Sequence, residues 1–366
     1  MTDTQHVNAI GSPIEDLDTP ALLLDLDLSE SNLKRMAAFF KDRPCKLRPH
    51  FKNHKCTTLA RRQLDSGSAV GITCAKLGEA EVLAQAGFND LLIANQVVGK
   101  GKTQRLMEVA KKTRLAVAVD SVSEIQLLSE AAVAADAHLH VLVEVDVGMG
   151  RCGVEPGKPT LALAREIVAQ PHLTFDGIQA FEGHVVYIND TEERSRSARE
   201  AVQLAIDSRR LIESSGLEVK VISGGSSSTY QTTGQLDGVD ELQAGTYATM
   251  DWRYQRMVPE FELALTVLTR VISRSGGRAV LDVGVKGLGG EFGAPLVPGY
   301  PDVEVPFFLS EEHLVLQNPP PGKVGDAVRL VSSHACTTCN LYREMFVHSG
   351  GKVIDVWPIE AVGRQQ

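Results

Sequence analysis

Residues 114–145 read RLAVAVDSVSEIQLLSEAAVAADAHLHVLVEV, an apolar run, a helix-length segment and a second apolar run. The two runs, Leu115–Val119 and His140–Val145, are continuous rather than alternating, which is typical of parallel strands buried on both faces. The segment between them, Val122–Ala135, has the length and composition of a helix. The stretch therefore predicts a strand–helix–strand unit.

The same alternation continues in both directions along the chain. The predicted strands are Ala21–Leu24, Lys46–Pro49, Gly71–Cys74, Asp90–Ala94, Leu115–Val119, His140–Val145, Phe175–Phe181 and Leu217–Ser223. Eight strand–helix alternations predict an α/β fold, a (β/α)8 barrel. The alternative is an open doubly wound sheet, but no G-x-G-x-x-G follows an early strand, which disfavours its dinucleotide-binding form.

The two ends of the chain differ from this pattern. Residues 1–18 are polar and are expected to form a poorly ordered lead-in. After about residue 255 the helical periodicity fades, and β-prone runs alternate with glycine- and proline-rich turns. The sequence thus predicts a barrel over 19–254 and a second, mostly β domain over 255–366.

Composition excludes several classes of protein. The chain has 366 residues, 43% hydrophobic and 23% charged, as in soluble globular proteins. With 37 basic and 46 acidic residues its net charge is −9, and without a basic cluster neither nucleic acid nor an anionic membrane is an expected partner. No apolar run reaches the roughly 18 residues of a membrane span, and the N-terminus lacks a secretory signal. Six scattered cysteines indicate a reduced, cytoplasmic protein.

The end of the second predicted strand carries RPHFKNHK, residues 48–55. Two lysines, two histidines and an arginine lie together there, and barrel active sites lie at the C-terminal ends of the strands. One interpretation is a solvated basic loop. The other is a Schiff-base lysine, because neighbouring cations disfavour protonation of an amine and leave it nucleophilic.

Together with Thr19-Pro20 and with VDVGMGRCG, residues 145–153, this segment resembles the alanine-racemase-like barrels that bind pyridoxal phosphate. Within them it resembles the branch of D-threonine aldolase and D-serine dehydratase, over nearly the whole chain from Asp18 to Pro358. The resemblance implies that Lys52, rather than Lys55, carries the cofactor.

Two glycine-containing segments are candidates for the rest of the cofactor site. Alone, each could be an ordinary turn or flexible loop. The resemblance implies that Arg151 faces the phenolic oxygen of the cofactor, which suits a guanidinium. The loop Ser223–Thr229 suits a phosphate cradle, because glycines let backbone N–H groups approach and hydroxyls add donors. The cofactor-binding candidates are Lys52, Arg151, Ser223, Gly224, Gly225, Ser226, Gln243, Gly245, Thr246 and Tyr247.

The chain departs from the racemase pattern at two positions, Glu144 and Gln243. Racemases of this fold usually have a lysine where Glu144 stands, and they place an arginine beside the pyridine nitrogen where this chain has Gln243. A neutral glutamine perturbs the cofactor less than a fixed cation does.

The β domain holds His334-Ala335-Cys336. On a strand, residues two apart share a face, so both side chains could bind one ion, with Cys339 out of phase as a buried thiol. A structural zinc site is the alternative for Cys336-x-x-Cys339, but no second such pair completes four ligands. The resemblance implies that His334 and Cys336 bind one divalent metal; a thiolate favours zinc over manganese or magnesium.

Two more residues are catalytic candidates with Lys52. His184 follows the seventh predicted strand, and the resemblance places it near the metal. Glu311 lies in Ser310-Glu311-Glu312-His313, which resembles a short acidic segment of the family. The alternative for His184 is a structural histidine, and the alternative for Glu311 is an exposed acidic turn.

These observations predict a metal-activated, pyridoxal-phosphate-dependent aldolase that cleaves D-3-hydroxy amino acids to glycine and an aldehyde. The alternatives are D-serine dehydratase, which yields pyruvate and ammonia, and a 3-hydroxy-D-aspartate aldolase or dehydratase. A racemase is disfavoured because no Gly-Tyr-Gly segment supplies a second base. A non-catalytic cofactor carrier is disfavoured because such carriers lack a second domain. Homodimers are common in this fold, and a homodimer is one candidate assembly of this chain.

Overall fold

The computed structural model describes residues 9–305 and 310–366. The chain forms two compact units. The barrel unit comprises Met36–Lys52, Ala60–Gly245 and Arg364–Gln366, and the β unit comprises Met1–Arg35, Asn53–Leu59 and Thr246–Gly363. These bounds differ from the predicted 19–254 and 255–366 because the first strand of the chain pairs within the β unit.

The barrel unit contains eight parallel strands. In sheet order they are β2 (Lys46–Leu47), β9 (Glu241–Leu242), β8 (Val221–Gly224), β7 (Leu173–Ala180), β6 (Leu139–Glu144), β5 (Arg114–Val119), β4 (Asp90–Ile93) and β3 (Ile72–Cys74). Parallel bridges from Leu47 to Ala69 and from His50 to Thr73 join β2 to the chain around β3, which brings the two ends of the sheet together. The predicted (β/α)8 barrel is therefore confirmed.

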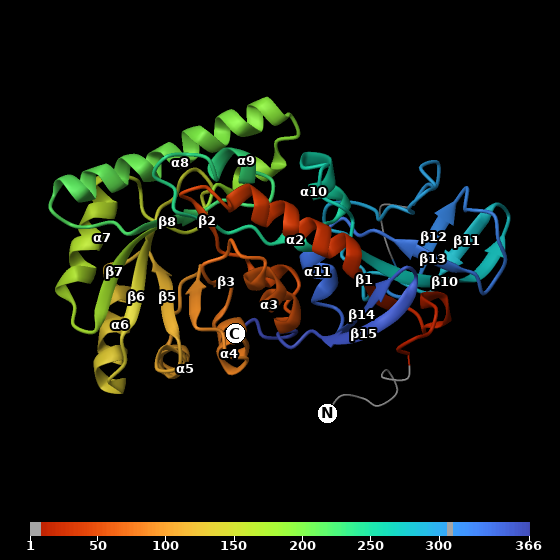
Figure 1. The fold of residues 1–366 in the computed structure, drawn as a ribbon, viewed down its shortest axis with the longest axis horizontal. Helices are drawn as coiled ribbons and strands as arrows, with labels where there is room; N and C mark the ends of the chain where they lie inside the picture. The colour runs from red at the N-terminus through yellow and green to blue at the C-terminus, as the bar shows by residue number, and fades with distance from the viewer. Residues whose placement is uncertain (1–8, 306–309) are drawn as a thin grey trace. The chain divides into compact units, whose positions relative to one another are not determined.

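Helices cover the outside of these strands. They are α4 (Leu77–Gln85), α5 (Lys100–Ala110), α6 (Val122–Ala135), α7 (Lys158–Ala169) and α8 (Thr191–Ser214) (Figure 1). Side chains cap two of them: the Ser121 hydroxyl accepts from Glu124 N at the start of α6, and Asp190 accepts from Glu193 N at the start of α8. The helices α2 (Leu26–Phe40) and α3 (Thr57–Asp65) begin in the β unit and end in the barrel unit, and α9 (Tyr230–Thr233) belongs to the barrel unit.

One predicted barrel strand belongs elsewhere. β1 (Ala21–Asp25) pairs antiparallel with β10 (Leu265–Ser275) and parallel with β14 (Glu344–Ser349), so its assignment to the barrel is wrong. An apolar run such as Leu22–Leu24 is equally well buried by either sheet, and the sequence does not say which. The eighth barrel strand is instead β9, whose two residues are too short to show a pattern.

The β unit contains a seven-stranded sheet. Its order is β12-β11-β10-β1-β14-β15, and β13 also pairs with β10. The further bounds are β11 (Arg278–Leu281), β12 (Leu314–Gln317), β13 (Ala327–Leu330) and β15 (Lys352–Pro358), with two short helices, α10 (Trp252–Met257) and α11 (Ala335–Cys339). The predicted mostly β second domain is confirmed.

The lead-in is ordered where it is described. Residues 14–16 form a 3-10 helix, η1, and Ile14 and Leu17 are buried in one apolar cluster with Leu23 and Leu268. The expectation of disorder is therefore wrong for residues 9–18, because Ile14 and Leu17 anchor this otherwise polar segment in the apolar cluster. Residues 1–8 lie outside the described part of the chain.

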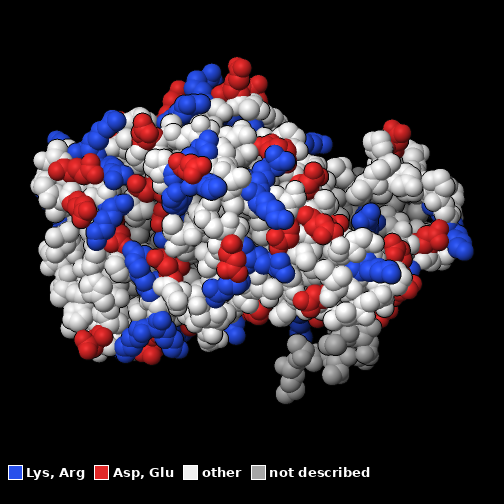
Figure 2. Space-filling model, in the orientation of Figure 1, with Lys and Arg blue, Asp and Glu red and all other residues white. Residues whose placement is uncertain are grey.

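The surface carries no extended patch of one charge on the face seen in Figure 2, where acidic and basic side chains are interspersed. Among the helices of the described residues, none is both long and apolar enough to cross a bilayer.

Candidate active site

Lys52 and Arg151 lie over the same aromatic ring. Lys52 follows β2 in the short helix η2 (Phe51–Asn53), Arg151 follows β6, and Phe181 follows β7. The Lys52 Nζ and the guanidinium carbon of Arg151 are each 5.7 Å from the centroid of the Phe181 ring. This distance is within the range of a cation–π contact. The structure thus brings two predicted cofactor residues together at the C-terminal ends of barrel strands.

Arg48 has a different role from its neighbours in RPHFKNHK. Its guanidinium is buried, donates to both carboxylate oxygens of Glu241 at 2.7 Å and to Asp90 Oδ1 at 2.6 Å, and so links β2 to β9 and β4. The expectation that Arg48 crowds a lysine is wrong, because two carboxylates compensate its charge. Arg151 is the cation that shares the aromatic ring with Lys52.

Lys55 belongs to the β unit, whereas Lys52 belongs to the barrel unit. Lys55 is buried, has a left-handed backbone with φ of 55°, and lies close enough to Cys339 for its charge to act on that thiol. The environment of Lys55 is therefore the packed interior of the β unit, which favours Lys52 as the cofactor lysine.

The turn that presents Arg151 is held by Asp146. Its Oδ1 accepts from Gly148 N at 2.9 Å and from Gly150 N at 3.0 Å. Burial opposes ionisation of Asp146, but these backbone N–H groups lower its pKa. Gly148 has φ of 115°, and a Cβ there would lie 3.1 Å from His184 Cε1, so this glycine makes room for the imidazole.

His184 stands in η3 (Gly183–Tyr187), directly after the end of β7. Its Nδ1 is buried and has no hydrogen-bond partner among the described residues. A buried ring nitrogen without a partner keeps an unused capacity for a hydrogen bond or a proton. Its position after β7 and its unpartnered Nδ1 keep His184 a candidate base. Its expected proximity to the metal stays a prediction.

The serine-rich loop is compact and buried. A Cβ at Gly224 would lie 1.8 Å from the Ala180 carbonyl oxygen, so only glycine fits beside β7. Ser226 N donates to Thr229 Oγ1 at 3.0 Å, and the Ser226 and Ser228 hydroxyl oxygens are 2.8 Å apart. The loop thus concentrates small hydroxyl side chains at the end of β8, as a phosphate cradle requires.

A carboxylate that the sequence analysis missed anchors this loop. Glu182 is 1% exposed and accepts from Gly225 N at 3.1 Å, Thr229 Oγ1 at 2.9 Å and Thr233 Oγ1 at 2.6 Å. It ties the loop after β8 to the end of β7. Its one signal in the sequence is an acid placed between Phe181 and His184, directly after a buried strand.

Gln243 is fixed by a buried hydrogen-bond network. Its Nε2 donates to Gln179 Oε1 at 2.6 Å and to Ser223 Oγ at 2.9 Å, and Gly245 follows it at the edge of the barrel unit. A neutral, oriented amide therefore occupies this position. Thr246 and Tyr247 lie in η4 (Thr246–Ala248) of the β unit, so their contribution to the cradle stays a prediction.

The His334–Cys336 pair lies at a helix start, not on a strand. His334 is the residue before α11 and Cys336 is in its first turn, so the predicted strand phase is wrong. The two side chains nevertheless interact: burial alone would lower the pKa of His334, but hydrogen bonds to Cys336 and Glu291 raise it to about 9. Six residues of mixed propensity, HACTTC, do not distinguish a short helix from a strand. Cys339 is fully buried, as predicted.

Three residues that the sequence analysis missed hold this pair. Glu291 Oε1 lies 2.5 Å from His334 Nδ1, which leaves Nε2 for another ligand. The buried Asp251 accepts from Ala335 N and Tyr254 N, both at 2.9 Å, and thereby joins the starts of α11 and α10. Asn53 Nδ2 donates to Cys336 Sγ at 3.6 Å.

The donor set is small. Across residues 9–305 and 310–366, no group of three or more His, Cys, Asp and Glu side chains is arranged to hold a metal ion. The imidazole of His334, which Glu291 orients, and the thiol of Cys336 are ligand types that suit zinc. With only these two protein ligands, the remaining coordination positions would be taken by water or substrate.

Glu311 lies on an exposed turn before β12. Its carbonyl accepts from Lys286 N at 3.2 Å, and the neighbouring Glu312 forms an ion pair with Lys286 at 2.8 Å. No described residue hydrogen-bonds to the Glu311 carboxylate, so nothing in the β unit orients it toward His334 or Cys336.

Known proteins resemble the chain along its whole length. A family model described as alanine racemase, N-terminal domain, matches residues 24–251, and a serine dehydratase domain model matches residues 264–348. D-threonine aldolase from Arthrobacter sp is 38% identical, covering 96% of this chain and 95% of that protein. 3-hydroxy-D-aspartate aldolase from Paracoccus denitrificans (strain Pd 1222) is 35% identical, covering 97% and 94%. The crystal structure of D-threonine aldolase from Filomicrobium marinum matches with a TM-score of 0.94 at 38% identity, covering 97% and 98%.

Proposed function

The chain belongs to the alanine racemase family, and from that premise we propose that it is a metal-activated, pyridoxal-phosphate-dependent aldolase. It would cleave D-3-hydroxy amino acids to glycine and an aldehyde. The observation that carries the proposal is the 38% identity to D-threonine aldolase over 96% of the chain. Lys52 and Arg151 over the Phe181 ring supply the amine and the guanidinium that such a reaction uses.

The barrel residues fit pyridoxal phosphate. When bound, the cofactor acts as an electron sink for the carbanion left by bond cleavage. Lys52 would hold it covalently through its amine, and Arg151 would face its phenolic oxygen. The Ser226 hydroxyl and the backbone around Gly224, in the loop that Glu182 orders through Gly225 N, would bind the phosphate. The neutral Gln243, locked by Gln179 and Ser223, would face the pyridine nitrogen without adding a charge.

The β unit residues fit a divalent metal. His334 Nε2 and Cys336 Sγ would be its ligands, and Glu291 orients the imidazole through Nδ1. A bound metal acidifies a coordinated hydroxyl. His184, whose Nδ1 is unpartnered in the described structure, would take the proton from the 3-hydroxyl of the substrate. Zinc is the metal that the thiolate favours, ahead of manganese or magnesium. A homodimer and a cytoplasmic location stay predictions.

Product analysis tests the proposal. Purified protein with pyridoxal phosphate and a divalent ion is incubated with D-threonine, L-threonine and D-serine, each with and without chelator. We expect glycine and acetaldehyde from D-threonine, negligible turnover of L-threonine at equal concentration, and loss of activity with chelator. Preference for the L-form, or full activity in metal-free protein, would refute the proposal.

A D-serine dehydratase is the second candidate. It is favoured by the match of residues 264–348 to a serine dehydratase domain and by the thiolate donor Cys336. In that reaction the metal would make the hydroxyl a leaving group, and Lys52 would remove the α-proton. Pyruvate and ammonia from D-serine, at a rate above that of D-threonine cleavage, would establish it instead.

A further inference from the structure

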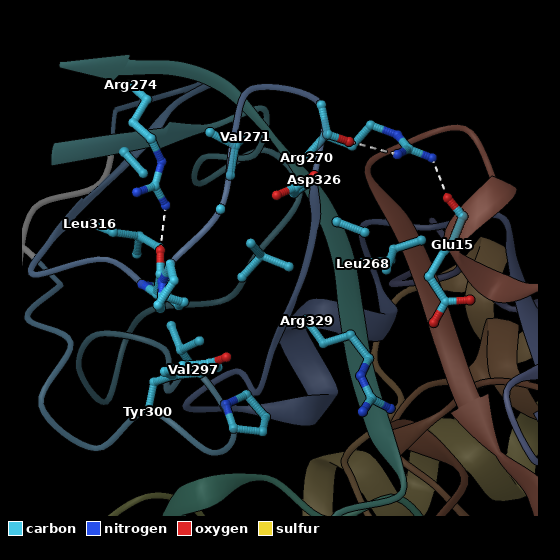
Figure 3. A pocket seen from close by; sticks show the side chains of 18 of the residues that line it. Glu15, Leu268, Arg270, Val271, Arg274, Val297, Tyr300, Leu316, Asp326 and Arg329 are labelled. Carbon is cyan, nitrogen blue, oxygen red and sulfur yellow. Dashed lines mark hydrogen bonds between the residues drawn. The ribbon is translucent and has the colours of Figure 1, made fainter.

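The β unit contains a cavity of about 660 Å³ (Figure 3), and its described lining includes neither His334 nor Cys336. Arg274 and Arg329, which both line it, lie on opposite faces of the sheet, because a register shift in β10 separates Arg274 from the residues that pair with β13. These two guanidinium groups therefore cannot bind one anionic group together. The buried polar groups that bear on the proposed chemistry of this unit lie around Cys336 instead.

Asn53 is a buried residue whose amide faces Cys336. It is 1% exposed, and its Nδ2 donates to Cys336 Sγ at 3.6 Å. Sulfur is a larger atom than oxygen and a weak acceptor, so this separation is that of an N–H group in contact with the sulfur. Asn53 ends the short helix η2 and belongs to the β unit, as Cys336 does.

Thr249 fixes the direction of this amide. The Thr249 hydroxyl donates to Asn53 Oδ1 at 2.7 Å, and Thr249 is fully buried. The Thr249 carbonyl accepts from Ala264 N at 3.0 Å and from Leu265 N at 2.9 Å, which ties this residue to the start of β10. Because Oδ1 faces the hydroxyl, the NH2 group of the amide points the other way, toward Cys336. The network thus presents a donor, and not an acceptor, to the sulfur.

A donor at this position suits a cysteine that binds a metal. The form of cysteine that acts as a ligand is the thiolate, and an N–H group stabilises the negative charge on its sulfur, whereas an amide oxygen would repel it. The imidazole of His334 also forms a hydrogen bond with Cys336. Contacts with Asn53 and with His334 therefore restrict the position of the sulfur.

We propose that Asn53 is a positioning residue of the metal site: its amide, oriented by Thr249, holds the Cys336 thiolate in place for the ion through a hydrogen bond to the sulfur. The inference rests on the proposed function, in which His334 and Cys336 bind a divalent metal. Asn53 is the residue after Lys52 in RPHFKNHK, so one motif would supply both the cofactor lysine and a residue that serves the metal.

A titration with cobalt(II) tests the proposal, because cobalt(II) enters sites of the zinc type and gives a sulfur-to-metal charge-transfer band when a thiolate binds it. The full chain is titrated before pyridoxal phosphate is added, so that the absorbance of the cofactor does not overlap the band. The dissociation constant of cobalt and the position of the band are recorded. The wild type should show the band and Cys336→Ala should lose it. A wild type without the band would refute the proposed metal pair itself, and this inference with it.

Asn53→Leu keeps the approximate size of the side chain and removes the donor. We expect the dissociation constant of cobalt to rise by roughly 10–100-fold, as is usual when a residue that orients a metal ligand is lost. The band should move to longer wavelength, because a thiolate without its hydrogen bond gives up an electron more readily. Asn53→Ala should change both quantities in the same direction, and it tests the inference if the leucine variant does not fold.

Asn32→Ala is the matched control. Asn32 is also 1% exposed and lies in the β unit, where its amide donates to the Glu262 carbonyl and accepts from Glu262 N, both at 2.8 Å. Its loss should lower the melting temperature, as the loss of Asn53 does, but should leave the cobalt affinity and the band unchanged. With the band present in the wild type, an unchanged band in the Asn53 variants would overturn this inference alone. Equal changes in Asn32→Ala would also overturn it, because they would reduce the role of Asn53 to stability.

Discussion

The carboxylate of Glu182 orders the serine-rich loop, and Glu182→Gln tests how much the cofactor depends on it. Glu182 accepts three hydrogen bonds, one from Gly225 N and two from the hydroxyls of Thr229 and Thr233. Glutamine keeps one acceptor oxygen. If this oxygen takes the place of Oε1, it still accepts from both threonines, but the amide NH2 then faces the N–H of Gly225.

The magnitude follows from this mismatch. A buried donor left without an acceptor costs about 1–3 kcal/mol, and neutral hydrogen bonds are roughly half as strong as charged ones. We therefore expect the ordered loop to be destabilised by about 2 kcal/mol, or about 30-fold in its equilibrium. Because only the ordered loop binds phosphate, the dissociation constant of pyridoxal phosphate should rise by about ten- to thirtyfold.

The assay is a titration of cofactor-free protein with pyridoxal phosphate, followed by absorbance, with kcat measured at saturating cofactor. The kcat should stay within about threefold, because Glu182 acts through the loop and not on the substrate. Glu130→Gln, an exposed glutamate of α6, is the matched control and should change neither quantity. A dissociation constant within threefold of the wild type in Glu182→Gln would refute the reasoning.

Three other predictions concern the remaining elements of the site and the barrel. Lys52→Ala should abolish the visible absorbance of the lysine-linked cofactor while Lys55→Ala keeps it, and an adduct found on Lys55 after borohydride reduction and peptide mapping would contradict the assignment. Glu291→Gln should weaken metal binding by roughly 10–100-fold, because the carboxylate orients the His334 imidazole. The control Cys339→Ala should keep its metal. Metal analysis after dialysis measures both variants, and metal retention in Glu291→Gln equal to that of the wild type would contradict the ligand geometry. Burial raises the pKa of Glu124 to about 7 in the folded protein. The folded protein therefore keeps a proton that the unfolded chain loses above pH about 4.5. The free energy of unfolding should fall as the pH rises from about 4.5 to about 7. The melting temperature of Glu124→Gln should fall less between pH 5 and pH 8 than that of the wild type, and parallel curves would contradict this.

The sequence predicts the barrel because its signals are local. Continuous apolar runs such as those of β5 and β6 mark buried parallel strands wherever they occur. Arg151 follows such a run and Lys52 follows a short extended segment, so the rule that barrel sites lie at strand ends points to both segments. The resemblance to the family singles out the two residues within them, and their roles stay predictions.

The residues that the sequence did not predict depend on partners distant in the chain. Glu182 binds donors more than forty residues away, and Asp251 binds the N–H of Ala335. A buried acid and an exposed acid look alike in a sequence, and only the fold shows which one meets N–H groups. The same holds for β1, whose leucines fit either sheet.

The position of β1 in the β-unit sheet has a consequence for synthesis of the protein on the ribosome. Leu23 pairs with Thr266 on one side and with Phe346 on the other, about 240 and about 320 residues later. At 5–20 residues per second, these apolar side chains wait roughly 12 to 60 s for their neighbours, while the strands of the barrel emerge and pair in chain order. During that interval the apolar run Ala21–Leu24 lacks both of its strand partners, which makes it prone to aggregation. Truncation of the last strands from the C-terminus would leave a segment at the opposite end of the chain prone to aggregation.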